Sequence, residues 1–286
     1  MNIQTIGVVG CGLMGSGIVE VCARAGFEVI VVEADEERLA AGLARVQQSL
    51  QRAVSRGKVP AAEAEATLSR VRGTTHLEDL RPVDLVIEAV TEDMAIKQRI
   101  FRELDGILRP EVIIASNTSS LSIAALAAVT KRPDKVLGMH FFNPVPVMAL
   151  LELVRSILTS EETLATAQAI GARLGKTTVV APDRPGFIVN RLLIPYIIDA
   201  IKLYEAGLAS KEDIDTAVKL GLAHPMGPLT LADLVGLDTT LAVADVLYEE
   251  YGEARFKAPP LLRRMVAAGL LGRKSGRGFY DYRAQG

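Results

Sequence analysis

One acidic side chain stands in an otherwise apolar segment of the sequence. Residues 140–154 read HFFNPVPVMALLELV, and Glu152 lies in a run that is apolar enough for a buried strand. A carboxylate without a partner is too costly to bury, so Glu152 must be exposed, neutral or paired. The nearest titratable residue in the segment is His140, which precedes a turn marked by Asn143 and two prolines. Because that turn can fold the second run back on the first, we expect His140 and Glu152 to approach each other.

Residues 10–15 read GCGLMG and match the pattern G-x-G-x-x-G. The pattern alone is weak, but here it follows the apolar run TIGVVG and opens a segment with helical spacing, which is the context of a dinucleotide-binding turn. Gly10 allows a tight turn, Gly12 lets the backbone approach a pyrophosphate, and Gly15 permits close helix–strand packing. The predicted cofactor-binding residues here are Gly10, Gly12, Leu13, Met14 and Gly15. A glycine turn that only packs is the alternative.

Glu33 ends the second predicted strand, about twenty residues after the glycines, where a ribose-binding acid is expected. A carboxylate accepts hydrogen bonds from the ribose hydroxyls and repels the extra phosphate of NADP. Residues 35–37, DEE, strengthen that repulsion, whereas Arg38 would weaken it. We therefore predict NAD as the cofactor.

An NAD site gives the histidine and the carboxylate a chemical purpose. Oxidation of a secondary alcohol requires a base that removes the hydroxyl proton while hydride leaves carbon, and histidine is the natural base near neutral pH. A carboxylate on the other ring nitrogen fixes the tautomer and stabilises the imidazolium that forms. Two unrelated structural roles for His140 and Glu152 remain the alternative at this point.

The elements that must position these residues follow from the apolar periodicity. Strand, glycine turn, helix and strand within about thirty residues make a βαβ unit, which implies a parallel sheet. The turn with two prolines suits a reversal of direction better than a crossover helix. We expect an α/β domain of Rossmann type, with a doubly wound, mostly parallel sheet and antiparallel C-terminal strands. Its predicted strands are residues 5–10, 28–33, 84–90, 111–117, 135–142 and 147–154, with a last helix–strand pair in 161–180. Residues 35–72 are predicted to be helical, with a break at 57–60.

The strand signal ends near residue 184. Residues 187–207 read as one long helix that is apolar nearly all round, which is typical of a buried or interfacial helix. Shorter helical segments follow at 209–221, 228–252 and 259–272. We predict two domains, residues 1–184 and an all-helical domain of residues 185–286, the latter for substrate binding and dimerisation.

Composition and charge exclude several classes of protein. The 32 basic and 34 acidic residues give a net charge of −2, which offers no basic excess for a nucleic acid. No apolar stretch is long enough to cross a membrane, and the N-terminus lacks the basic segment of a signal peptide. The two cysteines form no metal-binding spacing and suit a reducing compartment. We expect a cytoplasmic protein with no metal, nucleic-acid or membrane partner.

Several segments of the sequence together resemble one enzyme family. They are VGCGLMGSGI, ASNTSSLSI, GMHFFNPVPVMALLELV, PGFIVNRLL, HPMGPLTLADLVGLDTT and GRKSGRGFYDY. The chain resembles the 3-hydroxyacyl-CoA dehydrogenases over essentially its whole length and, among them, the bacterial 3-hydroxybutyryl-CoA dehydrogenases. The resemblance implies NAD-dependent oxidation of a (3S)-3-hydroxyacyl-CoA to the 3-oxoacyl-CoA in β-oxidation, or the reverse reduction in butanoate synthesis. It also implies a homodimer formed through the helical domain.

The resemblance further implies roles for individual residues. It makes His140 the catalytic base and Glu152 its orienting partner, and this favours the pair over two structural roles. The matched active-site polar residues are Ser119, Asn143 and Asn190. The matched cofactor contacts are Glu33, Glu92, Lys97, Ser119, Asn143 and Lys274. The matched substrate contacts are Ser49, Ser119, Asn190 and the basic cluster of Arg52, Arg56 and Lys58, which faces the CoA phosphates.

Two other functions are compatible with parts of the sequence. A dehydrogenase of a free hydroxy acid or sugar acid, such as the related gulonate dehydrogenases, has no use for the basic cluster, which would then be a solvated helix face. A non-catalytic NAD-binding structural protein does not require Ser119, His140, Glu152 and Asn190 together. A dehydrogenase that acts on a CoA thioester is therefore the preferred interpretation.

Overall fold

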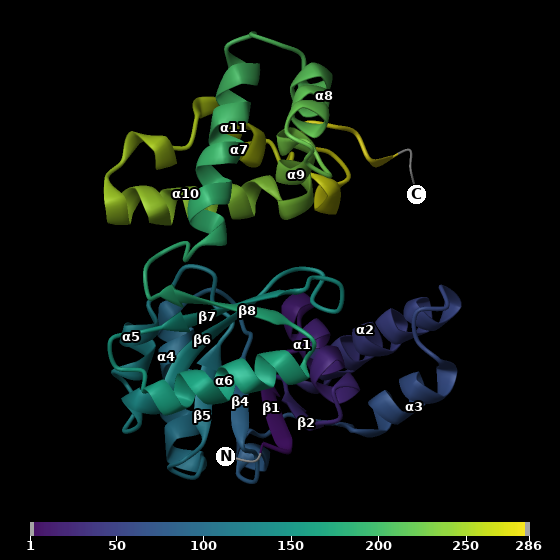
Figure 1. Ribbon diagram of the computed structural model, residues 1–286, viewed down its shortest axis with the longest axis vertical. Helices are drawn as coiled ribbons and strands as arrows, with labels where there is room; N and C mark the ends of the chain where they lie inside the picture. The colour runs from purple at the N-terminus through teal and green to yellow at the C-terminus, as the bar shows by residue number, and fades with distance from the viewer. Residues whose placement is uncertain (1–2, 284–286) are drawn as a thin grey trace. The chain divides into compact units, whose positions relative to one another are not determined.

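The computed structural model describes residues 3–283 of the chain (Figure 1). The chain forms two compact units, Met1–Arg184 and Pro185–Gly286. The first unit combines a sheet with helices, whereas the second is helical. Each has its own hydrophobic core, so the two units are described in turn.

Eight strands of the described residues form a single sheet in the first unit, in the order β3-β2-β1-β4-β5-β6-β7-β8. The strands are β1 (Thr5–Val9), β2 (Glu28–Val32), β3 (Val71–Thr74), β4 (Leu85–Glu88), β5 (Ile113–Ser116), β6 (Val136–Phe141), β7 (Leu150–Arg155) and β8 (Thr177–Pro182). All neighbours pair in parallel except β6 and β7, which are antiparallel, and β8 again runs parallel to β7. The predicted mostly parallel sheet with antiparallel C-terminal strands is therefore confirmed.

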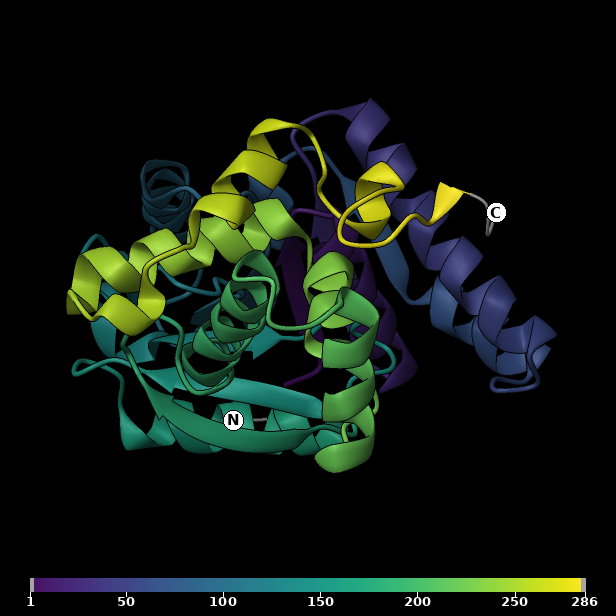
Figure 2. The ribbon, with the colours of Figure 1, turned by 90° about the horizontal axis from the view of Figure 1, so that it is seen from above.

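Helices connect and cover the strands of this sheet. They are α1 (Leu13–Arg24), α2 (Glu36–Ser55), α3 (Ala61–Ser69), α4 (Met94–Ile107), α5 (Ile123–Ala127) and α6 (Glu161–Arg173). The side chains of Asp35 and Asp93 cap α2 and α4 by accepting a hydrogen bond from the backbone N–H three residues on. The helices α2 and α3 form a hairpin that extends beside α1 (Figures 1 and 2).

The edge strand β3 corrects the predicted helix over residues 35–72. Its sequence, VRGT, has only four residues and includes an exposed arginine and a glycine, so its own strand signal is weak. Pairing with β2, in the register Val29 opposite Val71, decides its conformation. Gly73 is also needed there, because a Cβ would lie 2.9 Å from a methyl carbon of Leu39.

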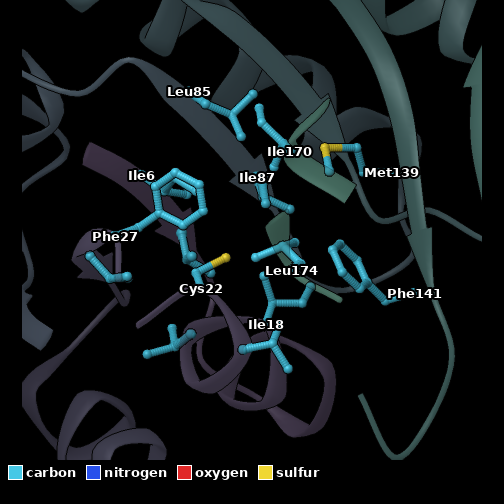
Figure 3. Close-up of a cluster of buried hydrophobic side chains, with 14 of the residues drawn as sticks. Ile6, Ile18, Cys22, Phe27, Leu85, Ile87, Met139, Phe141, Ile170 and Leu174 are labelled. Atoms are coloured by element: carbon cyan, nitrogen blue, oxygen red, sulfur yellow. The ribbon is translucent and has the colours of Figure 1, made fainter. Parts of the chain in front are cut away.

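The hydrophobic core of the first unit lies between the sheet and its helices. Figure 3 shows Ile18 and Cys22 of α1 and Ile170 of α6 among side chains from the strands, including Ile87 of β4. Both cysteines are buried free thiols. Burial, followed by the Glu33 carboxylate, raises the pKa of the Cys11 thiol to about 12. Cys11 is therefore a protonated packing residue near neutral pH.

The second unit is built from α7 (Val189–Glu205), α8 (Lys211–Gly221), α9 (Pro228–Val235), α10 (Leu237–Tyr251) and α11 (Pro260–Ala267). The segment predicted as one helical stretch over 228–252 is two helices, α9 and α10, which meet at Gly236. The apolar face of α7, including Ile197 and Ile201, is fully buried in the core of this unit. Other apolar side chains of the same helix are exposed, with Leu192 at 66%. None of the described helices is long and apolar enough to cross a membrane.

Candidate active site

The glycine turn joins β1 to α1 at the carboxyl end of the strand. Gly10 has a φ of +92°, and its N–H donates to the Val32 carbonyl at 2.8 Å. A Cβ on Gly10 would lie 2.8 Å from the Ala89 oxygen, and one on Gly15 would overlap the Gly10 oxygen. A Cβ on Gly12 would meet nothing within 4 Å. The turn is thus closed towards the sheet and open where α1 begins, which suits the approach of a pyrophosphate.

A cavity of about 460 Å³ lies beside this turn, within the range typical of ligand pockets. Its polar side chains are Glu33, Arg38, Thr75, Thr91, Arg99 and Glu103. The carboxylate of Glu33 accepts from the Cys11 N–H at 2.5 Å and from the Ala34 N–H at 3.1 Å, which holds it at the end of β2. Nε of Arg38 lies 3.4 Å from Oδ2 of Asp35, so the Asp35 carboxylate compensates part of the positive charge of Arg38. Arg99 was not predicted as a site residue, because nothing in its helix distinguishes it from a solvated cation.

His140 and Glu152 form a buried pair on neighbouring strands. They are register partners in the antiparallel pairing of β6 with β7, and the distance from Nδ1 of His140 to Oε2 of Glu152 is 2.7 Å. His140 is 6% exposed and Glu152 is fully buried. Phe142 lies against the imidazole, with ring centroids 4.6 Å apart. A carboxylate only accepts, so Nδ1 donates to it, and Nε2 is the nitrogen that can take up a proton.

Ser119 lies in the turn after β5, and Glu92 organises that turn. Oε1 of Glu92 accepts from the N–H groups of Ser119 and Ser120 at 2.9 and 3.1 Å, and from the Thr118 hydroxyl at 2.6 Å. The Ser119 hydroxyl is 3.2 Å from the same oxygen. Because β4 and β5 are parallel neighbours, the segments that follow them meet at one edge of the sheet, where ligands of such sheets bind. The structure thus brings together two residues that the sequence analysis predicted separately.

Lys97 is predicted as a cofactor contact, and the structure places it in a buried cluster. Its side chain is 1% exposed, and Nζ donates to Oε1 of Glu88 at 2.7 Å, with Oε2 of Glu92 at 3.6 Å. Glu88 was not predicted from the sequence as a site residue. The sequence did indicate a buried carboxylate there, because Glu88 ends the apolar run DLVIE just as Glu152 lies within the apolar run MALLELV.

A second cavity, of about 150 Å³, gathers several predicted substrate residues. Its polar lining comprises Ser16, Glu20, Arg45, Gln48, Ser49, Arg52 and Asn143. Asn143 reaches it from the turn after β6, where the Asn143–Pro144 peptide bond is cis. Arg56 and Lys58, at and beyond the end of α2, are exposed and do not line this cavity. The structure therefore joins Ser49 and Arg52 to Asn143 but not to the rest of the basic cluster.

Glu20 in this second cavity was not predicted from the sequence. It is 1% exposed, and its Oε2 has no hydrogen-bond partner among the described residues. Burial raises the pKa of the Glu20 carboxyl, although the Ser49 hydroxyl and the cations Arg24, Arg52 and Lys176 act in the opposite direction.

Two predicted site residues belong to the second unit. Asn190 lies in the first turn of α7 and is half-buried. Lys274 follows α11, and its Nζ donates to Oδ2 of Asp238 at 2.6 Å. Within residues 3–283, no group of three or more His, Cys, Asp or Glu side chains is arranged to hold a metal ion.

Comparison with known families agrees with both units. Residues 5–184 match the NAD-binding domain of 3-hydroxyacyl-CoA dehydrogenase, and residues 186–282 match its C-terminal domain. The chain is 55% identical over 282 residues to a 3-hydroxybutyryl-CoA dehydrogenase of Mycobacterium tuberculosis, covering 98% of this chain and 99% of that protein. It is 48% identical over 282 residues to a probable 3-hydroxybutyryl-CoA dehydrogenase of Bacillus subtilis, covering 99% and 98%.

Solved structures show the same likeness. The crystal structure of (S)-3-hydroxybutyryl-CoA dehydrogenase from Ralstonia eutropha superposes with a TM-score of 0.94 at 49% identity, covering 98% of this chain and 99% of that one. FadB2 of Mycobacterium tuberculosis superposes with a TM-score of 0.97 at 54% identity, covering 99% and 100%. The resemblance noted from the sequence motifs is therefore confirmed, and this chain belongs to the 3-hydroxyacyl-CoA dehydrogenase family.

Proposed function

We propose that the protein oxidises (3S)-3-hydroxyacyl-CoA thioesters, with (S)-3-hydroxybutyryl-CoA as the preferred substrate, to 3-oxoacyl-CoA with NAD, and catalyses the reverse reduction. The observation that carries the proposal is the buried His140–Glu152 pair, at 2.7 Å, in a chain whose two halves both match this enzyme family. The relatives named 3-hydroxybutyryl-CoA dehydrogenase support the short acyl chain.

The residues that line the cavity beside the glycine turn fit NAD. The open turn at Gly12 offers backbone N–H groups to the pyrophosphate, and Glu33 offers carboxylate oxygens to the ribose hydroxyls of the adenosine half. When bound, NAD supplies the acceptor for the hydride that leaves C3 of the substrate. The carboxylates of residues 33 and 35–37 disfavour the additional phosphate of NADP.

His140 acts as the base in this reaction. As the C3–H bond breaks, Nε2 takes the hydroxyl proton and the C3–O bond becomes a carbonyl, so the imidazole becomes an imidazolium. Glu152 holds Nδ1–H throughout and stabilises that positive charge, which its own burial makes more effective because little water screens the pair. In the reverse direction the imidazolium returns the proton to the carbonyl oxygen.

The polar residues predicted around the substrate divide into two groups. We propose that the hydroxyl of Ser119 and the amide of Asn190 hold the substrate hydroxyl or thioester carbonyl, and that Asn143 contacts substrate and cofactor. Ser49 and the basic cluster of Arg52, Arg56 and Lys58 bind the CoA portion. The joint lining of the second cavity by Ser49, Arg52 and Asn143 supports this assignment.

Initial rates of nicotinamide reduction test the proposed function. The purified protein is assayed with (S)-3-hydroxybutyryl-CoA, free 3-hydroxybutyrate and L-gulonate, each with NAD and with NADP. Turnover confined to the thioester, and faster with NAD, is the expected result. Turnover of a free acid alone would replace the substrate assignment and leave the basic cluster as solvated surface. Absence of turnover on all three, with NAD bound, would support a non-catalytic role.

The proposed assembly is a homodimer formed through the second unit. Large apolar side chains are exposed there, with Leu208 at 72%, Leu220 at 79% and Leu222 at 61%. Exposed apolar surface of this kind is typical of a subunit interface. Sedimentation equilibrium at several protein concentrations checks the mass of the assembly. The cytoplasmic location expected from the sequence stays a prediction, which cell fractionation would test.

A further inference from the structure

A buried carboxylate at the end of β4 has no place in the reaction described so far. Glu88 is fully buried, and three donors contact it at 2.7 Å: the Val90 N–H and Lys97 Nζ on Oε1, and the Ser116 hydroxyl on Oε2. Its partner Lys97 is 1% exposed. Removing one member of such a pair leaves an uncompensated charge in a site that water does not reach, and that is strongly unfavourable.

Lys97 extends this contact towards the turn that carries Ser119. Its Nζ lies 3.4 Å from the Val90 carbonyl oxygen and 3.6 Å from Oε2 of Glu92. The other oxygen of Glu92 accepts the hydrogen bonds from residues 118–120. Burial alone would raise the pKa of Glu92, but the Lys97 cation and these donors outweigh it and lower that pKa. Glu92 therefore binds the turn as a carboxylate, which only accepts hydrogen bonds.

The two carboxylates compete for one cation. At 2.7 Å, Glu88 holds Nζ much more closely than Glu92 does at 3.6 Å. Without the charge of Glu88, Nζ has one carboxylate left to compensate it and is drawn towards Glu92. Glu92 then shares its oxygens between Lys97 and the turn, and the N–H and hydroxyl of Ser119 lose their fixed acceptor.

We propose that Glu88 is a positioning residue of the active site, which by holding Lys97 away from Glu92 fixes the turn that carries Ser119. The proposal rests on the proposed function, because Ser119 is there the residue that holds the substrate. It assigns to Glu88 an effect on the turnover step, although Glu88 is fully buried. A displacement of about 1 Å in such a group is enough to lower turnover about 100-fold.

The test compares Glu88→Gln with the native enzyme in two backgrounds. In the native background kcat falls about ten- to 100-fold. In the Ser119→Ala background the same substitution changes kcat by less than about twofold, because the group it positions is already absent. A kcat for Glu88→Gln within about twofold of the native value would overturn the proposal. The proposal would also be overturned if kcat of the Glu88→Gln, Ser119→Ala double variant fell by the product of the two single losses. That result would show that Glu88 acts independently of Ser119.

A matched control separates positioning from loss of stability. Asp105 and Arg132 form another nearly buried ion pair in the same unit, 2.8 Å apart, far along α4 from the turn of Ser119. Asp105→Asn is expected to lower Tm, as Glu88→Gln does, but to leave kcat within about twofold of the native value. An equal loss of kcat in Asp105→Asn would reduce the effect at Glu88 to destabilisation and overturn the proposal.

A second variant keeps the test usable if Glu88→Gln does not fold. The neutral pair Glu88→Gln with Lys97→Met removes both buried charges, which proteins often tolerate. It also removes the cation that would be drawn to Glu92, so Glu92 keeps its hydrogen bonds to the turn and kcat at saturating NAD stays within about tenfold of the native value. A larger loss of kcat in this variant would overturn the proposal. Rates are compared on whichever acid or thioester the native enzyme oxidises. A failure of the Glu88 proposal is therefore distinguishable from a failure of the substrate assignment.

Discussion

His140 and Glu152 face each other directly across the antiparallel strands β6 and β7, with Nδ1 and Oε2 2.7 Å apart. The Glu152 carboxylate, which lies in the apolar run of residues 147–154, is therefore paired with His140. A shift of one residue in the register of the two strands would turn Glu152 to the opposite face of the sheet and remove the contact. Strand pairing thus orients His140, the proposed catalytic base, towards Glu152.

Glu152→Gln is expected to lower kcat about 100- to 10,000-fold. The amide keeps the shape of the side chain, but it can donate to Nδ1 and so favour the tautomer with its proton on Nε2, and it supplies no negative charge to the imidazolium. Stopped-flow and steady-state rates measure the loss, and His140→Ala should show a loss of similar size. Calorimetric titration should find NAD binding almost unchanged in both variants. Near-normal kcat in either variant would remove the pair from the mechanism.

Glu33→Ala is expected to weaken NAD binding about tenfold and to narrow the preference for NAD over NADP. The carboxylate supplies acceptors for the ribose hydroxyls and also anchors the Cys11 N–H of the glycine turn. The ratio of kcat/KM for the two cofactors is the measurement. Glu65→Gln removes an exposed acid of α3 that does not line the cavity beside the glycine turn, and should leave the ratio unchanged. An unchanged ratio in Glu33→Ala would place the ribose elsewhere.

Replacing Arg52, Arg56 and Lys58 together by Gln is expected to raise KM for (S)-3-hydroxybutyryl-CoA about tenfold. Each exposed cation contributes modestly to binding of the CoA phosphates, and salt should reduce the difference from the native enzyme. KM for NAD should stay constant. The single variants then show whether Arg52, which lines the second cavity, contributes most.

The control for this prediction is Arg102→Gln, which removes an exposed cation of α4. It should leave KM for the thioester unchanged at any ionic strength. If the triple variant behaves like Arg102→Gln, the basic cluster is a solvated helix face, as a substrate without CoA would imply.

Glu20→Gln is expected to stabilise the protein at neutral pH but not at acidic pH. Burial raises the pKa of Glu20 in the folded state above its ordinary value of 4.5, so the native protein favours the protonated carboxyl. The contribution of Glu20 to stability is therefore complete below the unfolded pKa and is lost as pH rises through the folded pKa. Urea unfolding of both proteins from pH 4 to pH 8 measures the difference. A difference in unfolding free energy that does not grow with pH would show that folding does not raise the pKa of Glu20.

Local sequence patterns determined much of the fold of this protein and much of its candidate site. The glycine turn after an apolar run, the acid at the end of the next strand and the proline-marked reversal after His140 each depend on a few neighbouring residues, and the structure shows the corresponding turn, strand end and antiparallel pair. A charge inside an apolar strand was also a sound signal, because the cost of burial requires a partner wherever the chain folds. The cost of burial predicts a partner for Glu152 and, in the same way, for Glu88.

Tertiary structure alone decided the partner of Glu88 and the other contacts described next. Glu88 and Lys97 are brought together by the way α4 packs after β4, and Glu92 meets Ser119 because β4 and β5 are neighbours in the sheet. The strand β3 exists only through its pairing with β2, and Arg52 enters a cavity that Arg56 does not. Most of these relations join segments far apart in the chain, and the free energy that selects them comes from contacts that no local pattern contains.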